Sequence, residues 1–428
     1  MAYSGGLDST VLLHILIQDR RRHSATDFWQ GRPLSAIHVH HGLQSAADDW
    51  AAHCAHQCRH WSVDFRQESV SVDPSSPMGL EAAARESRYR AFERCLHTGG
   101  VLLTAHHRDD QAETLLQRLM RAGGLRGLAA MPEQRRLGDA ALLLRPMLSI
   151  GRAGLEDYAR RHQLQWIEDP SNAERHFDRN FIRHELLPVF ETRWSAAAQR
   201  LADSARHLRS DLNLLDALAA ERIQNLAYDG RSDVLMLSAL AALEPAMRTG
   251  LLRHWLATQH CYPSEPALLE LEQLIIANNN DGLARWQCGE LELRLWRDGL
   301  YRRVLRTEQG DDPLAQDWQP ETSIAWGGGV ISCQWQLRDQ GQPRLKADLS
   351  DLQWRHRQGG ERCRLPGRNH HHSLKQLLQE SSIPPWERPL MPLLVQGESV
   401  VAVPGLFIAD GAVAADDEPG WALHWRRD

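Results

Sequence analysis

The chain has 428 residues, of which 42% are hydrophobic and 24% are charged, and its formal net charge is −6 at pH 7. This length allows two or three domains with cores of their own, and the acidic balance excludes a uniformly basic nucleic-acid coat. Seven cysteines without a CxxC pair argue against a disulfide scaffold, a zinc ribbon and a CxxC redox site. Because no apolar run approaches the roughly 20 residues of a membrane span and no secretory signal is recognisable, we expect a cytoplasmic protein without a membrane partner.

The first part of the chain, residues 1–194, alternates short apolar runs with amphipathic stretches. Strands are expected at 35–40 and 100–105. Helices are expected around them, at 10–18, 46–61, 80–95 and 109–121. This alternation predicts an α/β fold with a Rossmann-like parallel sheet and helices on both faces, so ligands are expected at the carboxyl ends of the strands.

The rest of the chain predicts three further segments. Leucines recur at helical spacing from residue 201 to residue 218, whereas the residues from 291 to 305 alternate as in a strand. One helix is expected near 373–380, and strands are expected at 399–407 and 421–425. We therefore expect a mostly helical domain, a linker with short strands and a small α+β domain, at 195–306, 307–350 and 351–428 respectively.

The glycine loop near the start of the chain carries the clearest chemical signal. Glycines let the backbone approach an anion and adopt positive φ, and free N–H groups at a helix N-terminus favour phosphate. Asp8 would repel phosphate unless Mg²⁺ lay between them; otherwise it only helps to hold the loop. The loop is neither a Walker A motif nor GxGxxG, and its alternative interpretation is a capped turn. The candidate nucleotide-binding residues of the loop are Ser4, Gly5, Gly6, Leu7, Asp8 and Ser9.

A second cluster of polar residues, HHRDDQAE, follows an apolar run that predicts a strand. The strand delivers His106 to its carboxyl end, and Asp110 and Glu113 share one helical face because they are three residues apart. Such a pair can coordinate Mg²⁺ or hold an ammonium group, although helix capping also explains an aspartate there. His41 ends the other predicted strand, where it meets a nucleotide or packs at the strand end.

Taken in order, these motifs resemble the tRNA(Ile)-lysidine synthetases, a family of N-type ATP pyrophosphatases with a PP-loop. The first 190 residues contain the segments SGGLDS, HVHHGL, LEAAARESRY, TAHHRDDQAET, WIEDPSN and RNFIRHELLP. A second group of matching segments, PGR and IPPW, lies between residues 366 and 386. The resemblance therefore extends over most of the chain.

The resemblance implies an ATP-dependent ligase that forms a carbon–nitrogen bond. ATP would adenylate the C2 oxygen of the wobble cytidine in a tRNA(Ile) with a CAU anticodon. The ε-amino group of free L-lysine would then expel AMP, and the lysidine formed would change the identity of the tRNA from methionine to isoleucine. The implied cofactors are ATP and Mg²⁺, and the implied form is a monomer or a homodimer.

The family also implies roles for particular residues. Asp8 is assigned to Mg²⁺ and the triphosphate, and Asp110 with Glu113 is assigned to the lysine. Arg85 and Arg183 are candidates for the phosphates or the lysine carboxylate, with Arg88 and Arg179 as weaker ones. The expected catalytic set is Asp8, Arg85, Asp110, Glu113 and Arg183. The expected nucleotide-binding set is the glycine loop with His41 and His106.

Local charge favours a large anionic substrate. Residues 118–161 contain nine arginines and four acidic residues. Residues 355–388 contain seven basic residues and three acidic ones. Such stretches fit tRNA, although a solvated surface has the same composition. The alternatives are a PP-loop adenylating ligase that acts on a small-molecule carbonyl or on a different tRNA nucleotide, and a non-catalytic RNA-binding protein.

The segment before the glycine loop is shorter than a central strand requires. Only Met1, Ala2 and Tyr3 precede the loop, where four or five apolar residues are expected. We therefore expect that the sequence as given begins downstream of the natural start.

Overall fold

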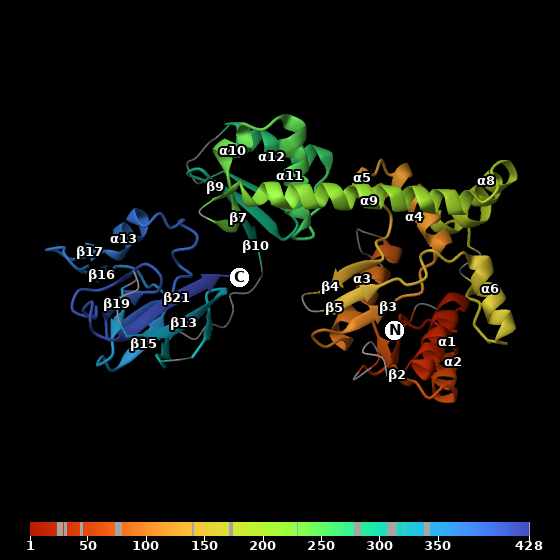
Figure 1. Ribbon diagram of the computed structural model, residues 1–428, viewed down its shortest axis with the longest axis horizontal. Helices are drawn as coiled ribbons and strands as arrows, with labels where there is room; N and C mark the ends of the chain where they lie inside the picture. The colour runs from red at the N-terminus through yellow and green to blue at the C-terminus, as the bar shows by residue number, and fades with distance from the viewer. Residues whose placement is uncertain are drawn as a thin grey trace. The chain divides into compact units, whose positions relative to one another are not determined.

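The chain divides into two compact units, Met1–Leu218 and Ala219–Asp428, in a computed structural model (Figure 1). The residues that it describes are 1–23, 29, 32–42, 46–72, 79–138, 141–170, 174–228, 230–277, 284–305, 315–320, 322–337 and 343–427. Among the described helices, none combines the length and the apolarity that a membrane crossing requires.

The first unit contains the helices and strands expected from the sequence. The helices are α1 (Leu7–Arg22), α2 (Ala47–His60), α3 (Leu80–Cys95), α4 (Arg108–Met120), α5 (Leu125–Leu128), α6 (Arg152–Arg161), α7 (Asp178–Phe181), the π-helical η2 (Ile182–Leu186), α8 (Leu187–Arg193) and α9 (Ala197–Gln224). The strands are β1 (Ser35–His40), β2 (Asp64–Ser69), β3 (Val101–Leu103), β4 (Gln134–Leu137) and β5 (Ala141–Leu144). Helix α9 continues past the boundary between the two units.

The strands of this unit join through the first three residues of the chain. Tyr3 N–H donates to the carbonyl of Ile37 in β1 at 2.8 Å, and Ala2 N–H donates to the carbonyl of Leu103 in β3 at 2.9 Å. β1 runs parallel to β2 and to the bridge at Ala2, and β3 runs parallel to β5. Among the described strands of this unit, only the edge strand β4 is antiparallel. The Rossmann-like parallel sheet is thereby confirmed, with β1 and β3 on either side of the segment that leads into the glycine loop.

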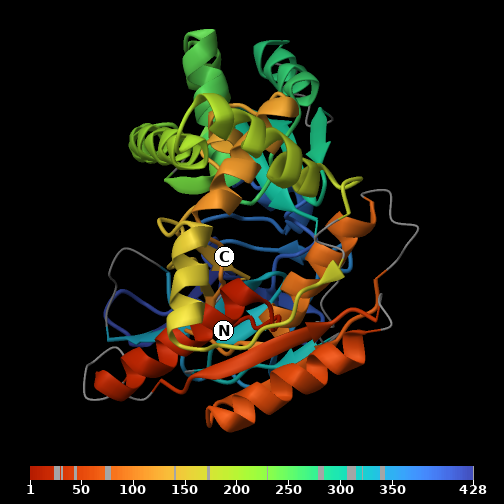
Figure 2. The same cartoon turned by 90° about the vertical axis from the view of Figure 1, so that its right-hand side faces the viewer.

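Alternate residues of the sheet fill two separate cores. Tyr3 and Ala36 pack with residues of α1, α2 and α6, whereas Ile37 and Leu102 pack with residues of α3. In Figure 2, α6 (yellow) lies beside α1 (red). Because successive strand residues point to opposite faces, this division places helices on both sides of the sheet.

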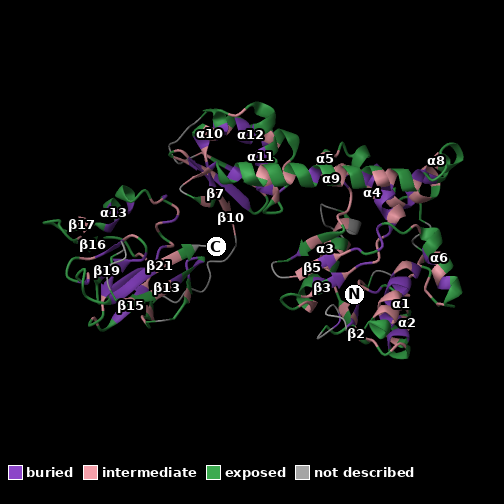
Figure 3. Ribbon diagram, in the orientation of Figure 1, coloured by how far each residue is buried: buried purple, intermediate pink, exposed green. Residues whose placement is uncertain are grey.

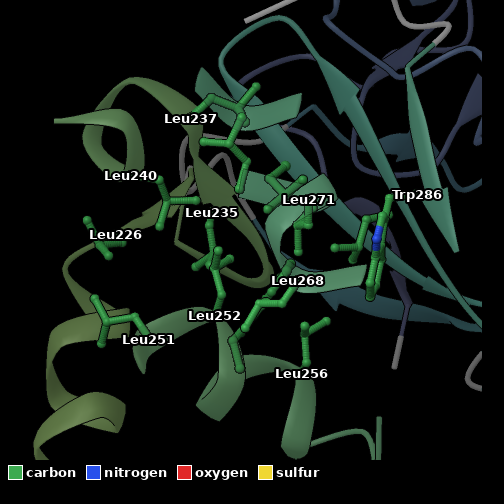
Figure 4. Close-up of a cluster of buried hydrophobic side chains, with 14 of the residues drawn as sticks. Leu226, Leu235, Leu237, Leu240, Leu251, Leu252, Leu256, Leu268, Leu271 and Trp286 are labelled. Atoms are coloured by element: carbon green, nitrogen blue, oxygen red, sulfur yellow. The ribbon is translucent and has the colours of Figure 1, made fainter. Parts of the chain in front are cut away.

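The second unit begins with helices packed on a small sheet. Its first elements are β6 (Ala227–Tyr228), β7 (Arg231–Met236), α10 (Leu237–Ala241), α11 (Pro245–Ala257), α12 (Glu265–Ala277), β8 (Arg285–Cys288), β9 (Leu291–Trp296) and β10 (Gly299–Val304). The strand expected at 291–305 is the hairpin β9–β10, and it belongs to a five-stranded sheet in the order β6-β7-β10-β9-β8. Leu235, Leu252, Leu271 and Trp286 form the core between sheet and helices (Figure 4). The sheet adds to the mostly helical region that the sequence predicted.

The last part of the chain is built from strands and one short helix. Its elements are β11 (Ala315–Asp317), β12 (Ile324–Trp326), β13 (Gly329–Gln336), β14 (Leu345–Lys346), β15 (Leu352–Arg355), β16 (Arg362–Cys363), β17 (His372–Ser373), α13 (Leu374–Glu380), β18 (Leu393–Gln396), β19 (Ser399–Val403), β20 (Phe407–Ile408) and β21 (Gly420–Arg427). The described strands form two larger sheets, in the orders β11-β15-β18-β19-β20 and β12-β13-β21-β14, and a two-stranded sheet, β16-β17.

The described strands between 307 and 350, where a linker with short strands was expected, pair and pack with the last part of the chain. β13 pairs along its whole length with β21, the last strand of the chain. Trp326, Ile331 and Leu345 from this segment are at most 1% exposed and share a core with Trp354. The polar composition of the segment concealed these few large apolar residues, which alternate with exposed ones along the strands.

Helix α9 shows where leucine spacing predicts a helix but not a core. Leu212 is buried, but Leu214, Leu215 and Leu218 are 62%, 52% and 54% exposed. Figure 3 shows exposed and intermediate colours along much of α9. The spacing therefore marked the helix correctly without marking one buried face.

An aromatic contact joins the two parts of the second unit. The ring of Trp386, which follows α13, meets Tyr301 of β10 edge-on at 5.4 Å and Trp296 of β9 at 6.3 Å between ring centroids. Beside it, Arg231 of β7 donates to the buried carboxylate of Glu387 at 3.1 Å. The contact fixes the segment 384–388 against the sheet that contains β7, β9 and β10.

Replacing Trp386 by Ala is expected to lower the free energy of unfolding of the second unit by about 1–3 kcal/mol, because two edge-to-face contacts are worth about 0.5–1.5 kcal/mol each. Urea unfolding of the full chain measures the loss. The matched control is Tyr262→Ala, since Tyr262 is 61% exposed and such surface changes stay within about 0.5 kcal/mol. Equal effects of the two substitutions would show that the aromatic contact does not stabilise the unit.

Candidate active site

The glycine loop connects the first three residues to α1 and is held by short polar contacts. Ser9 Oγ donates to the carbonyl of Gly6 at 3.0 Å and lies 3.0 Å from Ser4 Oγ. Gly6 is the N-cap of α1 and has no side chain that could cap the helix. The first N–H groups of α1 lie beside the loop, where helix starts bind anions.

Gly5 is the position in this loop that no other residue can fill without strain. Its φ is +82°, and a Cβ atom there would lie 2.9 Å from Cys54 Sγ and 3.0 Å from Ile167 Cδ1. Its carbonyl accepts from Ile167 N–H at 2.9 Å. Burial raises the pKa of the Cys54 thiol to about 12, so this cysteine packs under the loop as an uncharged group.

The second polar cluster forms the start of α4. His107 is the N-cap: its Nδ1 accepts from Asp109 N–H at 3.2 Å, and Asp110 Oδ2 accepts from His107 N–H at 2.9 Å. This is a capping box, built here from a histidine and an aspartate. Asp109 instead accepts from Arg152 N–H at 2.7 Å and thereby caps the start of α6. Capping thus accounts for Asp109, whereas Asp110 also has one oxygen engaged elsewhere.

Two arginines from the motif RNFIRHELLP converge on Asp110 and Glu113. Arg179 donates to Glu113 Oε2 at 2.7 Å and to Asp110 Oδ1 at 2.5 Å. Arg183 donates to Glu113 Oε1 at 2.6 Å and to Asp110 Oδ1 at 3.3 Å. Asp110 is 6% exposed and Glu113 is 1% exposed. We call these four residues the carboxylate–arginine network.

The electrostatics of the network follow from burial and from its neighbours. Burial raises the pKa of the Asp110 carboxyl, but His107 and Arg179 lower it more strongly, to about 2. Burial lowers the pKa of His106 to about 3, and neighbouring arginines add to this against the opposing effect of Asp110. At neutral pH, Asp110 is therefore ionised and His106 is a neutral ring.

A row of cations lies on the α3 side of the site. Arg88 Nε donates to His41 Nε2 at 3.2 Å, and burial together with Arg88 lowers the pKa of His41 to about 4. The guanidinium groups of Arg85 and Arg135 lie 5.3 and 4.8 Å from the ring centroid of Tyr89. These charges suit an anionic ligand, and neutral His41 adds a ring that accepts one hydrogen bond.

A single cavity of about 1020 Å³ connects these groups. Its lining includes ten of the twelve residues expected from the sequence: Ser4, Gly6, Leu7, Asp8, Ser9, His41, Arg85, His106, Asp110 and Arg183. Gly5 and Glu113 are not part of the lining. Gly5 lies against Cys54 under the loop, and both carboxylate oxygens of Glu113 already accept from arginines.

The structure adds residues that the sequence reasoning did not select. Trp166, Ile167, Glu168 and Asp169 line the cavity, and the hydrogen bond from Ile167 to the glycine loop explains why. They belong to the motif WIEDPSN, which was the available signal; residues 171–173 of that region lie outside the described residues. His107 was also missed, because the preceding His106 was the one expected at the strand end.

Family models match the chain in three successive ranges. A PP-loop domain matches residues 1–190, a TilS substrate binding domain matches 235–301 and a TilS substrate C-terminal domain matches 352–425. Each range falls within one of the segments expected from the sequence, namely the first, the second and the last.

Curated relatives are similar over nearly the whole length. The tRNA(Ile)-lysidine synthase of Pseudomonas putida is 42% identical over 440 residues, which is 100% of this chain and 95% of the relative. That of Xanthomonas campestris pv. campestris (strain 8004) is 41% identical over 412 residues, 94% of this chain and 89% of the relative. A solved structure of a TILS C-terminal domain is 21% identical, with a TM-score of 0.24, and covers 26% of this chain and 95% of that one.

The glycine loop before α1, the parallel sheet and the matching model define a PP-loop protein, a class that binds ATP. The full-length similarity is more specific. The chain belongs to the tRNA(Ile)-lysidine synthase family, as the motifs in its sequence predicted.

Proposed function

We propose that this chain joins L-lysine to the wobble cytidine of a tRNA(Ile) with a CAU anticodon, with cleavage of ATP to AMP and pyrophosphate. In the first step the cytidine O2 bonds to the α-phosphorus of ATP, and the bond to the β-phosphate oxygen breaks. In the second step the neutral ε-amino nitrogen of lysine bonds to C2, the C2–O2 bond breaks, AMP leaves with O2, and the new C–N nitrogen releases a proton to solvent. The observation that carries the proposal is that one cavity is lined both by residues of the glycine loop and by Asp110, Arg179 and Arg183 of the carboxylate–arginine network.

The phosphate end of the cavity is the glycine loop. The uncapped start of α1 offers N–H groups to the departing pyrophosphate, and Ser4 and Ser9 add hydroxyl groups. Arg85 and Arg88 supply positive charge to the lining of the same cavity. Because these groups are fixed by packing before the reaction, they stabilise the charge that develops as the α–β bond breaks.

The residues present also fit Mg²⁺. Asp8 Oδ1 is buried and has no hydrogen-bond partner in the described part of the chain, so one carboxylate oxygen beside the loop is available. Among the described residues, no group of three or more His, Cys, Asp or Glu residues could hold a metal alone. Mg²⁺ suits such a site, because it takes one or two protein carboxylates and completes its shell with phosphate oxygens and water. When bound, it neutralises phosphate charge.

The lysine end of the cavity is the carboxylate–arginine network. Asp110 lines the cavity and is the carboxylate that contacts the amine; Glu113 lies behind it and acts through Arg179 and Arg183. The two guanidinium groups partly offset the attraction of Asp110 for a charged amine, since nearby positive charge lowers the pKa of an ammonium group. The lysine amine must lose a proton before it attacks C2.

The incorporation of labelled lysine into transcripts tests this proposal. With ATP present, a CAU-anticodon tRNA(Ile) is expected to take up lysine, one AMP being formed for each lysine, and tRNA(Met) is expected to take up none. No incorporation, or equal incorporation into the two tRNAs, would refute the proposal. Pyrophosphate release without tRNA would instead favour a ligase for small molecules.

A further inference from the structure

His107 lies behind the cavity rather than in its lining, between the two motifs that supply the reactive groups. Its side chain is 1% exposed. Its Nε2 lies 3.6 Å from Asp8 Oδ2, on α1, and 3.7 Å from Asp110 Oδ2, on α4. Within the described residues Nε2 has no hydrogen-bond partner.

The other ring nitrogen settles which group Nε2 presents. In the neutral ring Nδ1 accepts from Asp109 N–H, so the proton is on Nε2. In the charged ring both nitrogens carry a proton, so Nε2 is a donor in either form. An N–H group therefore points between Asp8 and Asp110. Carboxylates repel one another, so a shared donor lowers the cost of holding both close together.

We propose that His107 is a positioning residue, whose Nε2–H holds Asp8 toward the triphosphate and Asp110 toward the lysine, so that the two half-sites keep one geometry. The distances of 3.6 and 3.7 Å are slightly longer than hydrogen bonds, and such bonds tighten when the substrates enter. The effect of His107 on Asp110 and lysine rests on the proposed function. Its effect on Asp8 and ATP requires only that the PP-loop binds ATP.

Two isosteric substitutions separate the roles of the two ring nitrogens. Asn reproduces Nδ1 and is a strong N-cap, so His107→Asn keeps the start of α4 but loses the N–H between the carboxylates. Gln reproduces Nε2 and loses the cap. We expect His107→Asn to melt at or above the temperature of His107→Gln, and yet to be the poorer enzyme. If His107 had a structural role only, the variant with the higher melting temperature would also be the more active enzyme.

The readouts are the dissociation constant of Mg²⁺–ATP without tRNA and the rate of tRNA-dependent pyrophosphate release. For His107→Asn we expect both to worsen by about 10–100-fold, as for other groups that orient ligating side chains; for His107→Gln we expect changes of about threefold or less on the same scale. His56→Asn, on the exposed face of α2, is the control and should match the wild type.

Equal values for the Asn and Gln variants, whether both high or both low, would overturn the proposal. The binding measurement uses no tRNA or lysine, so it judges His107 even if the wild type fails to form lysidine. That failure would count against the proposed function alone.

Discussion

Replacing Asp8 by Asn is expected to slow tRNA-dependent pyrophosphate release by about 10²–10³-fold, the usual loss when one group that stabilises transition-state charge is removed. Asn has nearly the shape of Asp but no negative charge, so it cannot hold Mg²⁺ against the triphosphate. Release is measured with saturating ATP and a CAU-anticodon transcript.

The fold should survive this substitution, which makes its effect interpretable. Asp8 Oδ1 has no hydrogen-bond partner among the described residues, and the side chain is 31% exposed. The loss of an acidic group at the start of α1 costs about 0.3–1 kcal/mol. Asp49→Asn is the matched control, since Asp49 also lies in the first turn of a helix but is exposed. Normal pyrophosphate release by Asp8→Asn would remove Asp8 from the phosphate site.

Much of the first unit could be predicted because its signals are local. Apolar runs of the right length gave β1 and β3, and period 3.6 gave α1 to α4. Spacing within a helix also put Asp110 and Glu113 on one face. What spacing could not give is the identity of their partners. Arg179 and Arg183 come from a segment more than 60 residues away, and they occupy the carboxylates before any substrate arrives.

Local charge was the weakest of the sequence signals. Several arginines of the basic stretch at 118–161 are paired in the structure, for example Arg121 with Asp178 at 3.3 Å and Arg126 with Asp216 at 2.5 Å. These acidic partners lie outside the counted window, so the count overstated the free positive charge. The described strands between 315 and 346 depend on similarly distant partners, since the carbonyl of Trp326 accepts from Trp425 Nε1–H and its ring packs with residues far along the chain.

Replacing Glu113 is expected to affect both the stability of the first unit and the binding of lysine, and the two effects can be measured separately. Its two oxygens accept from both arginines of the network, and the side chain is 1% exposed. Glu113→Ala would leave two guanidinium groups, 29% and 23% exposed, without their main partner. Breaking a buried ion pair on one side costs about 3–5 kcal/mol. Because the two guanidinium groups are partly exposed, we expect the free energy of unfolding to fall by about 3 kcal/mol.

Urea unfolding measures this loss, and the control is Glu185→Ala. Glu185 also pairs with an arginine, Arg175, but the two side chains are 39% and 72% exposed. Exposed pairs are worth at most about 1 kcal/mol, so the control should remain near the wild type. A similar small loss for Glu113→Ala would mean that the network does not hold α4 and α7 together.

The same variant also tests how lysine is recognised. Glu113 does not line the cavity, so its removal should act on lysine through Arg179, which is then free to pair fully with Asp110 and to screen it. We therefore expect the KM for lysine to rise by about tenfold, equivalent to roughly 1.4 kcal/mol, while the KM for ATP stays within about twofold. An unchanged KM for lysine in a stably folded Glu113→Ala would assign the amine to another carboxylate of the cavity. Glu168, which also lines it, is then the first to replace.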